Sequence, residues 1–155
     1  MDALDVNLIE LFTHEPKIGA LEASRRLGVA RGTVTARLER LERDGVITGW
    51  APRIDPEALG HPVTAFLTLE IRQGVGHDVV GEHLAAIPEV LEACTITGAG
   101  DLWARVVARS NADLQSVIDR ALAHEGIVRS ATVIALATQV PYRTGPLVRS
   151  VLGDR

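Results

Sequence analysis

The sequence has little of the chemistry that cysteine, lysine and aromatic residues provide. Cys94 is the only cysteine, Lys17 is the only lysine, and aromatic residues make up 3% of the 155 residues. One cysteine can form no internal disulfide, and a zinc site built on several thiolates is excluded. With no base beside it, Cys94 is expected to be a buried strand residue.

Long apolar runs and catalytic motifs are also missing. No run approaches the ~20 residues of a membrane-spanning helix. The first residues carry acids where a secretory signal would carry Lys or Arg, so we expect a cytoplasmic protein. The five histidines include no i, i+4 pair and no HExxH, and no serine lies in a G-x-S-x-G setting. We therefore expect no enzyme, no metal site and no cofactor.

The charge is uneven along the chain. The formal net charge is -4, yet residues 25–53 hold seven arginines against three acids. Planar guanidinium groups suit phosphates and guanine edges, although a GC-rich genome would give the same preference for arginine over lysine.

Residues 1–50 show the apolar spacing of three short helices. An Asp2 cap begins the first helix and Pro16 ends it. Gly28 ends the second, because a glycine readily adopts the left-handed conformation that closes helices, and Gly45 ends the third. The second and third helices are expected at about 20–27 and 31–43.

A short strand is predicted next from Val46, Ile47 and Trp50. Residues 51–62 hold three prolines and are expected to form a linker. The remainder alternates strands and helices in the order βαββαβ, with a cap at Asn111 for its second helix. Two βαβ halves with right-handed crossovers make a ferredoxin-like unit. Its elements are expected near 63–72, 78–87, 90–97, 102–108, 112–124 and 128–138.

One face of such a sheet lacks helices. Phe66, Trp103, Val107 and Ile134 would then expose apolar surface to water, which a second copy of the chain would cover. The alternative is that these side chains only edge the core. The tail at 141–155 either frays or packs on a neighbouring subunit, and the sequence leaves both open.

The helix at 31–43 divides into faces when its residues are placed about 100° apart. Val34, Leu38 and Leu41 point inward, and Gly32 and Ala36 lie on the outer face. The two exposed flanks beside them hold Thr33, Arg37 and Arg40 on one side and Thr35, Glu39 and Glu42 on the other. Small residues allow close approach to a major groove, while arginine forks reach bases or phosphates. The alternative is a solvated amphipathic helix in which Glu39 pairs with Arg43.

These features, in this order, resemble the Lrp/AsnC family of feast/famine transcription regulators over nearly the whole chain. The most specific segments are V-x-x-R-L-x-x-L-E at 34–42, GVI-x-G-aromatic at 45–50 and T-G-x-x-D at 97–101. Ala30 replaces the usual serine cap, and Trp50 replaces the usual tyrosine. The resemblance implies an α+β protein with four parts: a winged helix-turn-helix at 1–50, a linker at 51–62, a ferredoxin-like domain at 63–140 and a tail at 141–155.

The resemblance further implies a sequence-specific regulator that binds double-stranded DNA and forms a homodimer, and homodimers of this family often assemble further into octamers. The predicted DNA contacts are Arg31, Gly32, Thr33, Thr35, Ala36, Arg37, Arg40 and Arg53. Of these, Arg40 and Arg53 are assigned to phosphates.

The second domain is expected to bind an amino acid or a related metabolite. Glycine lets backbone N–H groups approach a carboxylate, and Asp101 can accept from an ammonium group. The alternative is a plain β-hairpin, in which glycine and aspartate are ordinary turn residues. The predicted effector residues are Thr97, Gly98, Ala99, Gly100, Asp101, Thr132 and Ile134.

Two other functions remain open from the sequence. A metabolite-binding module could act through a protein partner without specific DNA binding, which the overall acidity and Ala30 favour slightly. A small ferredoxin-like enzyme would need an acid–base pair that the sequence does not show.

Overall fold

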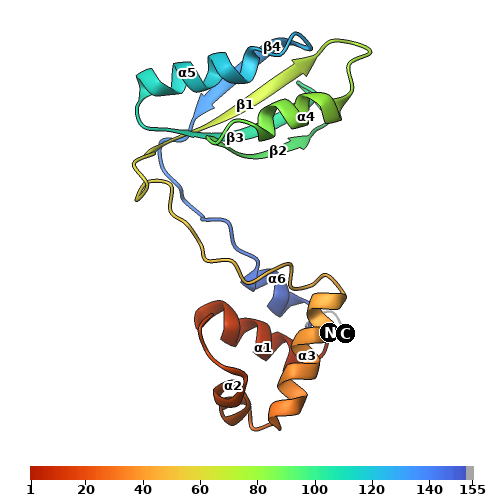
Figure 1. Ribbon diagram of the computed structural model, residues 1–155. Helices are drawn as coiled ribbons and strands as arrows, with labels where there is room; N and C mark the ends of the chain where they lie inside the picture. The colour runs from red at the N-terminus through yellow and green to blue at the C-terminus, as the bar shows by residue number, and fades with distance from the viewer. Residues whose placement is uncertain (153–155) are drawn as a thin grey trace. The chain divides into compact units, whose positions relative to one another are not determined.

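The computed structural model describes residues 1–152, which form two compact units. An N-terminal unit comprises Met1–Arg53 and the segment from Val140 onward, and a sheet unit comprises Ile54–Gln139. Both units are drawn in Figure 1. Among the described residues, no helix combines the length and the apolar character that crossing a bilayer would require.

Three helices of the N-terminal unit begin and end where the sequence predicts. They are α1 (Ala3–His14), α2 (Ala20–Leu27) and α3 (Arg31–Arg43). The Asp2 side chain accepts from the Asp5 N–H, and the Asp5 side chain accepts from the Asp2 N–H, which makes a capping box. Gly28 closes α2 at φ 67°, where a side chain would be strained.

The core of this unit lies between the three helices. Leu8, Phe12, Ala23 and Val34 are buried there, and Leu38 packs against them half-buried. The apolar stripe of α3 therefore points inward as predicted and fixes which of its faces meets solvent.

The strand predicted at Val46, Ile47 and Trp50 is wrong. The N–H groups of Val46 and Ile47 both donate to the Leu41 carbonyl, at 2.9 and 3.0 Å, and so close the end of α3. Trp50 packs edge-on against the Phe12 ring, with centroids 5.3 Å apart. A strand needs a partner strand, and the described part of the N-terminal unit contains none.

The tail contributes a short helix, α6 (Gly145–Ser150), that the sequence did not predict. It packs against α1, where the Arg149 guanidinium lies 2.7 Å from the Glu10 carboxylate. The tail of this chain therefore belongs to its own N-terminal unit, beside α1.

The sheet unit has the predicted βαββαβ order. Its strands lie in the order β2-β3-β1-β4, and each neighbouring pair is antiparallel. The helix cap is Ser110, not Asn111, because the Ser110 hydroxyl accepts from the Asp113 N–H. The last strand ends at Ile134 instead of 138. The elements are β1 (Val63–Ile71), α4 (His77–Ala85), β2 (Val90–Thr95), β3 (Leu102–Ala108), α5 (Asn111–Leu122) and β4 (Ile127–Ile134).

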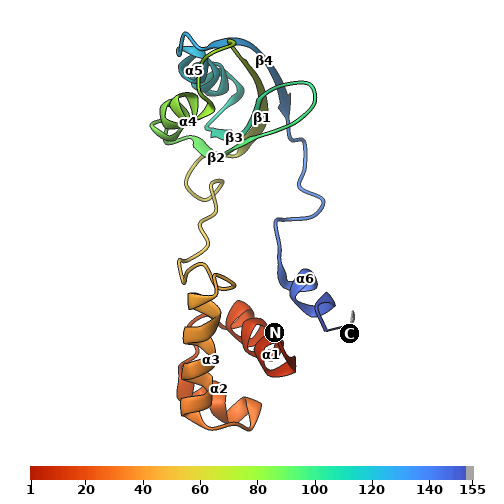
Figure 2. The same ribbon diagram turned by 90° about the vertical axis from the view of Figure 1, so that its right-hand side faces the viewer.

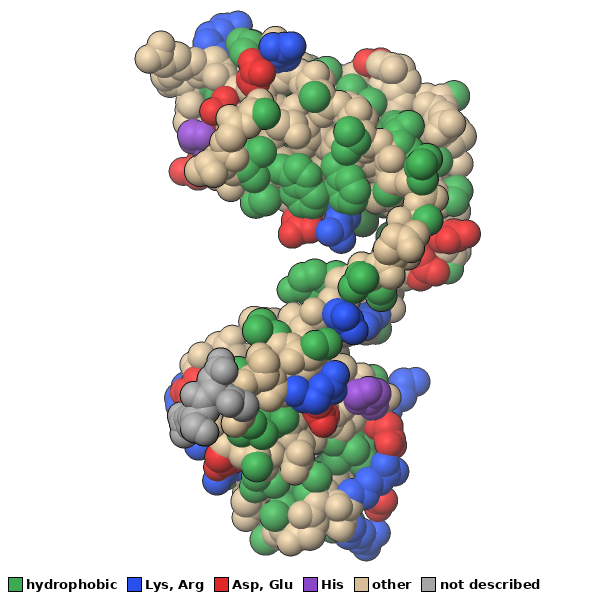
Figure 3. All heavy atoms as spheres, turned by 180° about the vertical axis from the view of Figure 1, so that it is seen from behind, with side chains coloured by type: hydrophobic (Ala, Val, Ile, Leu, Met, Phe, Trp, Pro, Cys, Tyr) green, Lys and Arg blue, Asp and Glu red, His purple; other side chains and the backbone are tan. Residues whose placement is uncertain are grey.

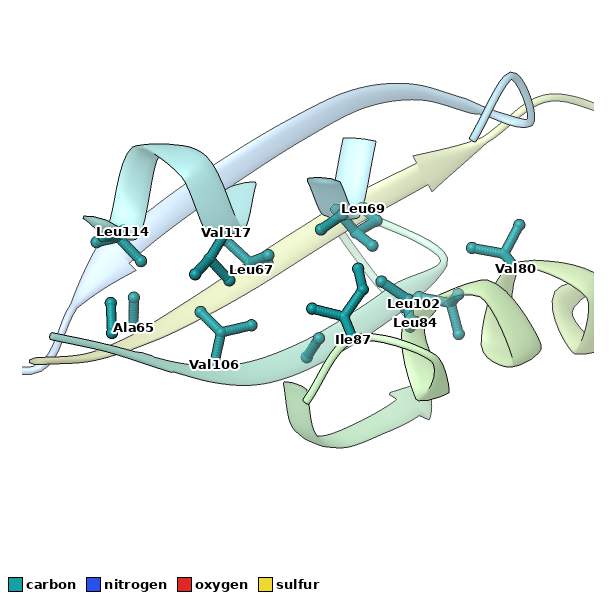
Figure 4. Packing of buried hydrophobic residues seen from close by; sticks show 13 residues of the cluster. Ala65, Leu67, Leu69, Val80, Leu84, Ile87, Leu102, Val106, Leu114 and Val117 are labelled. Atoms are coloured by element: carbon teal, nitrogen blue, oxygen red, sulfur yellow. The ribbon is translucent and has the colours of Figure 1, made fainter. Parts of the chain in front are cut away.

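The core of the sheet unit lies between one sheet face and both helices. Leu67 and Leu69 of β1 are fully buried beneath Leu84 of α4 and Val117 of α5. Figure 4 shows these side chains pointing toward one another across that layer. This packing makes β1 and β3 the centre of the unit.

The opposite face of the sheet has no helix, as Figure 2 shows. Phe66 and Trp103 stack there with ring centroids 5.3 Å apart, and the Arg105 guanidinium lies 5.8 Å from each ring. Figure 3 shows hydrophobic side chains gathered on this side of the sheet. The face therefore presents an aromatic and cationic centre.

Three expectations about this face need correction. Val133 lies opposite Phe66, whereas Ile134 lies opposite Ala65, which belongs to the helix-covered face. Val107 is buried rather than exposed. Cys94 is exposed, because β2 is an edge strand and Cys94 lies opposite Trp103 on the face without helices.

Replacing Leu67 with alanine should lower the free energy of unfolding of the sheet unit by about 2–5 kcal/mol, because a fully buried side chain is removed from its centre. The matched control is Leu136→Ala, whose side chain is 98% exposed and which should change stability by no more than about 0.5 kcal/mol. Urea unfolding followed by circular dichroism measures both. Equal stabilities for the two variants would contradict this core.

Candidate DNA-binding helix and effector loop

The first half of α3 presents a strip of small and polar residues to solvent. Arg31, Gly32, Thr35 and Ala36 are exposed, and Thr33 is half-buried. On the other side of the helix Val34 and Leu41 are buried. The strip is narrow because Gly32 and Ala36 have little or no side chain, so another surface can approach the helix backbone closely.

The missing serine cap does not displace the start of α3. Ala30 has the extended backbone of an N-cap residue, and its carbonyl accepts from Thr33 and Val34 at 3.0 and 3.2 Å. No side chain caps this end. The helix therefore begins at Arg31, as predicted, with the backbone of Ala30 as its cap and no contribution from the Ala30 side chain.

Arg37 and Arg40 are held by carboxylates from the start of α1. The Arg37 Nη1 lies 3.0 Å from Asp5 Oδ1 and also donates to Asp2, while the Arg40 Nη2 lies 2.6 Å from both Asp5 oxygens. The Asp5 side chain is only 1% exposed. These contacts fix the middle of α3 against the first turn of α1.

The same contacts change the acidity of the exposed partner. A hydrogen bond from the Arg37 guanidinium, more than any other cause, lowers the pKa of Asp2 from 3.8 to about 2. The pKa of Arg37 is raised in turn, mainly by its bond to Asp2. Each group therefore stabilises the charged form of the other.

Most other arginines of the basic segment also have acidic neighbours. Arg25 and Arg26 lie beside Glu22, and Arg43 lies 3.7 Å from Asp44 rather than pairing with Glu39. Within residues 1–152, neither Arg31 nor Arg53 forms an ion pair, and both side chains are exposed. These two side chains are the ones that can meet an external anion without first leaving a carboxylate.

The loop between β2 and β3 is anchored on β1. The Asp101 N–H donates to the Leu69 carbonyl at 2.9 Å, and the Ile71 N–H donates to Asp101 Oδ2 at 2.7 Å. Gly100 lies so close to β1 that an added Cβ would be 2.5 Å from the Thr68 methyl group. Gly98 has φ 117°, a conformation that favours glycine. Both glycines are therefore required by the path of the loop.

Asp101 thus has a structural partner that the sequence did not indicate. One carboxylate oxygen serves the Ile71 N–H at the end of β1, where the register with β4 shifts. Thr97, Gly98 and Ala99 are exposed, whereas Gly100 and Asp101 are half-buried. The exposed part of the loop and the second Asp101 oxygen are what a ligand could reach.

The structure does not bring Thr132 and Ile134 to this loop within one chain. They lie opposite Leu67 and Ala65 of β1. Ala65 and Leu67 are four and two residues from Leu69, to which the loop is bound, and at about 3.4 Å per residue these separations are roughly 14 and 7 Å along the strand. A pocket that includes both Ile134 and the loop would therefore need a second subunit.

Asp5 is the buried partner of Arg37 and Arg40 that the sequence did not bring to notice. Its position three residues before Leu8 and seven before Phe12 places it on the buried stripe of α1, where an acid is unusual. An acid at this position indicates a buried carboxylate, and such a group needs cationic partners elsewhere in the chain. Within the described residues, no cluster of His, Cys, Asp and Glu could hold a metal ion.

Comparison with known families assigns both units. Residues 1–48 match the family model described as a winged helix-turn-helix DNA-binding domain, and residues 64–144 match the Lrp/AsnC ligand binding domain. The HTH-type transcriptional regulator FL11 of Pyrococcus furiosus is 29% identical over 148 residues, which cover 92% of this chain and 97% of the relative.

Solved structures agree with these matches. The structure of AsnC from E. coli aligns with a TM-score of 0.86 at 26% identity, covering 94% of this chain and 99% of that one. The feast or famine regulatory protein from M. tuberculosis, complexed with L-methionine, aligns with a TM-score of 0.81 at 27% identity, covering 92% and 96%. The predicted fold class and family are confirmed. The chain belongs to the Lrp/AsnC family and is a transcription regulator with a helix-turn-helix DNA-binding domain and a ligand-binding domain, not an enzyme.

Proposed function

We propose that this regulator reads specific double-stranded DNA in the cytoplasm by placing the first half of α3 in a major groove. The observation that carries the proposal is the exposed strip of Arg31, Gly32, Thr35 and Ala36 on a helix whose other side is buried. Thr33 borders this strip. A rigid helix with small residues at its outer face suits close approach to base edges.

The arginines divide into two groups by their surroundings. Arg31 forms no ion pair with any of residues 1–152 and is exposed, and we assign it to a base edge. Arg37 and Arg40 are held by Asp5, and we assign both to phosphates together with Arg53. The sequence alone places Arg37 in the groove. Because its Nη1 is held by Asp2 and Asp5, we assign it instead to a contact with the DNA phosphate backbone.

The ligand that we propose for the sheet unit is an amino acid, bound at the loop 97–101. Support comes from the M. tuberculosis relative, whose structure holds L-methionine, and from the exposed Thr97, Gly98 and Ala99. The second Asp101 oxygen would accept from the ligand ammonium group. Thr132 and Ile134 would contribute from a second subunit.

We further propose that the face without helices pairs with a second copy of the chain, and that the resulting homodimers assemble into octamers. The stacked Phe66 and Trp103 rings lie at the centre of that face, where an apolar partner would remove them from water. A ligand at a subunit boundary would then change the spacing of two α3 helices without touching DNA. This proposal explains why one chain contains both a DNA-binding domain and a ligand-binding domain. The alternative, a metabolite-binding module that acts only through a protein partner, does not explain the DNA-binding domain.

The proposal is tested by mixing the purified full-length protein with sheared DNA of its own genome at near-physiological salt and sequencing the DNA that it retains. Discrete peaks support specific recognition, whereas uniform recovery contradicts it. Peaks beside amino acid metabolism genes would indicate which ligands to test.

Replacing Arg31 with alanine should weaken binding to a recovered fragment by about 1–3 kcal/mol, because a base contact is lost. Arg43→Ala removes the same charge from the far end of α3 and should cost less. Fluorescence anisotropy with the labelled fragment measures both variants. If the two losses are equal, Arg31 does not read a base.

Replacing Asp101 with asparagine should weaken amino acid binding by about 1.5–3 kcal/mol, because a charge-assisted hydrogen bond is lost while the side chain can still accept from Ile71. Titration calorimetry with each of the common amino acids identifies the wild-type ligand and then compares variants. Asp119→Asn, an exposed acid on α5, is the matched control. An unchanged affinity in Asp101→Asn would remove Asp101 from the ligand site.

A further inference from the structure

We propose that Asp5 is a positioning residue for DNA binding, which acts by holding the guanidinium groups of Arg37 and Arg40 ready for phosphates. The inference rests on the proposed docking of α3 on DNA. Asp5 itself is buried and would not touch DNA.

The Asp5 carboxylate is fully used. Its Oδ1 accepts from Arg37 at 3.0 Å and from Arg40 at 2.6 Å, and its Oδ2 accepts from Arg40 at 2.6 Å and from the Asp2 N–H at 2.9 Å. A buried carboxylate without such donors would be costly, so these bonds persist whenever the unit is folded. One acid thus fixes two arginines that are three residues apart on α3.

Each guanidinium has N–H groups beyond those that Asp5 and Asp2 engage. Among residues 1–152, recorded hydrogen bonds of Arg37 involve only Nη1, and those of Arg40 involve only Nη2. Their side chains remain 28% and 38% exposed. An arginine that is held along one edge can donate to a phosphate from its other nitrogens and loses less side-chain entropy on binding.

The direction in which DNA affinity changes when Asp5 is replaced distinguishes a positioning role from a simple effect of its negative charge. By charge alone, Asp5 repels the phosphates, and its removal should strengthen DNA binding. By positioning, removal frees both arginines and weakens binding. Asp5→Asn keeps the size of the side chain and changes only its charge and its ability to accept.

The experiment uses the full chain, a fluorescein-labelled mixed-sequence duplex and anisotropy titrations over a range of salt concentrations. We expect Asp5→Asn to bind roughly tenfold more weakly, with the slope of log affinity against log salt reduced by about 1–2. The matched control is Asp44→Asn, an exposed acid directly after α3, which should bind as tightly as wild type or more tightly.

Circular dichroism at the assay temperature shows whether each variant is folded. Folded Asp5→Asn that binds as tightly as wild type or more tightly overturns the inference. Wild type that fails to bind the duplex even at low salt contradicts instead the proposed docking of α3.

If Asp5→Asn does not fold, the inference is tested on the wild-type protein alone, by NMR. Side-chain NMR signals of Arg37 and Arg40 should show slow rotation of the guanidinium groups both before and after the duplex is added. Fast rotation in either state would overturn the inference.

Discussion

The buried carboxylate of Asp5 is the interaction on which the arrangement of the DNA-binding unit depends. Taking a charge out of water is costly unless cationic donors surround it. Here α3 supplies two such donors, Arg37 and Arg40. Because Asp5 also closes the capping box of α1, one side chain joins the start of α1 to the middle of α3. The apolar packing of Leu8, Phe12 and Val34 brings the helices together and sets which face of α3 points inward, and the ion pairs to Asp5 hold the middle of α3 in that orientation.

The sheet unit is under a different constraint, because its two helices cover only one face of the sheet and leave the other without helices. The covered face contains the Leu67 core, and the other carries the stacked Phe66 and Trp103 beside Arg105. The loop at 97–101 is joined to the central strand β1 by hydrogen bonds to Leu69 and Ile71. The surface that we propose for assembly and the loop that we propose for the ligand thus share the same strand.

Local signals predicted most of the fold, and long-range contacts account for what they missed. The Asp2 cap and Gly28 depend on neighbouring residues alone, so their helix ends were correct. The strand at 46–50 was wrong because its apolar pattern does not show whether a partner strand exists. The fixing of Arg37 by Asp5 joins residues 32 positions apart, which no periodicity contains. The DNA and ligand contacts themselves remain predictions.

The structure of the full-length protein bound to a duplex recovered from its genome would test the account most directly. The account predicts that the first half of α3 lies in a major groove while Asp5 keeps its bonds to Arg37 and Arg40, whose other nitrogens donate to phosphates. A complex in which α3 lies outside the groove, or in which either arginine has left Asp5, would contradict it.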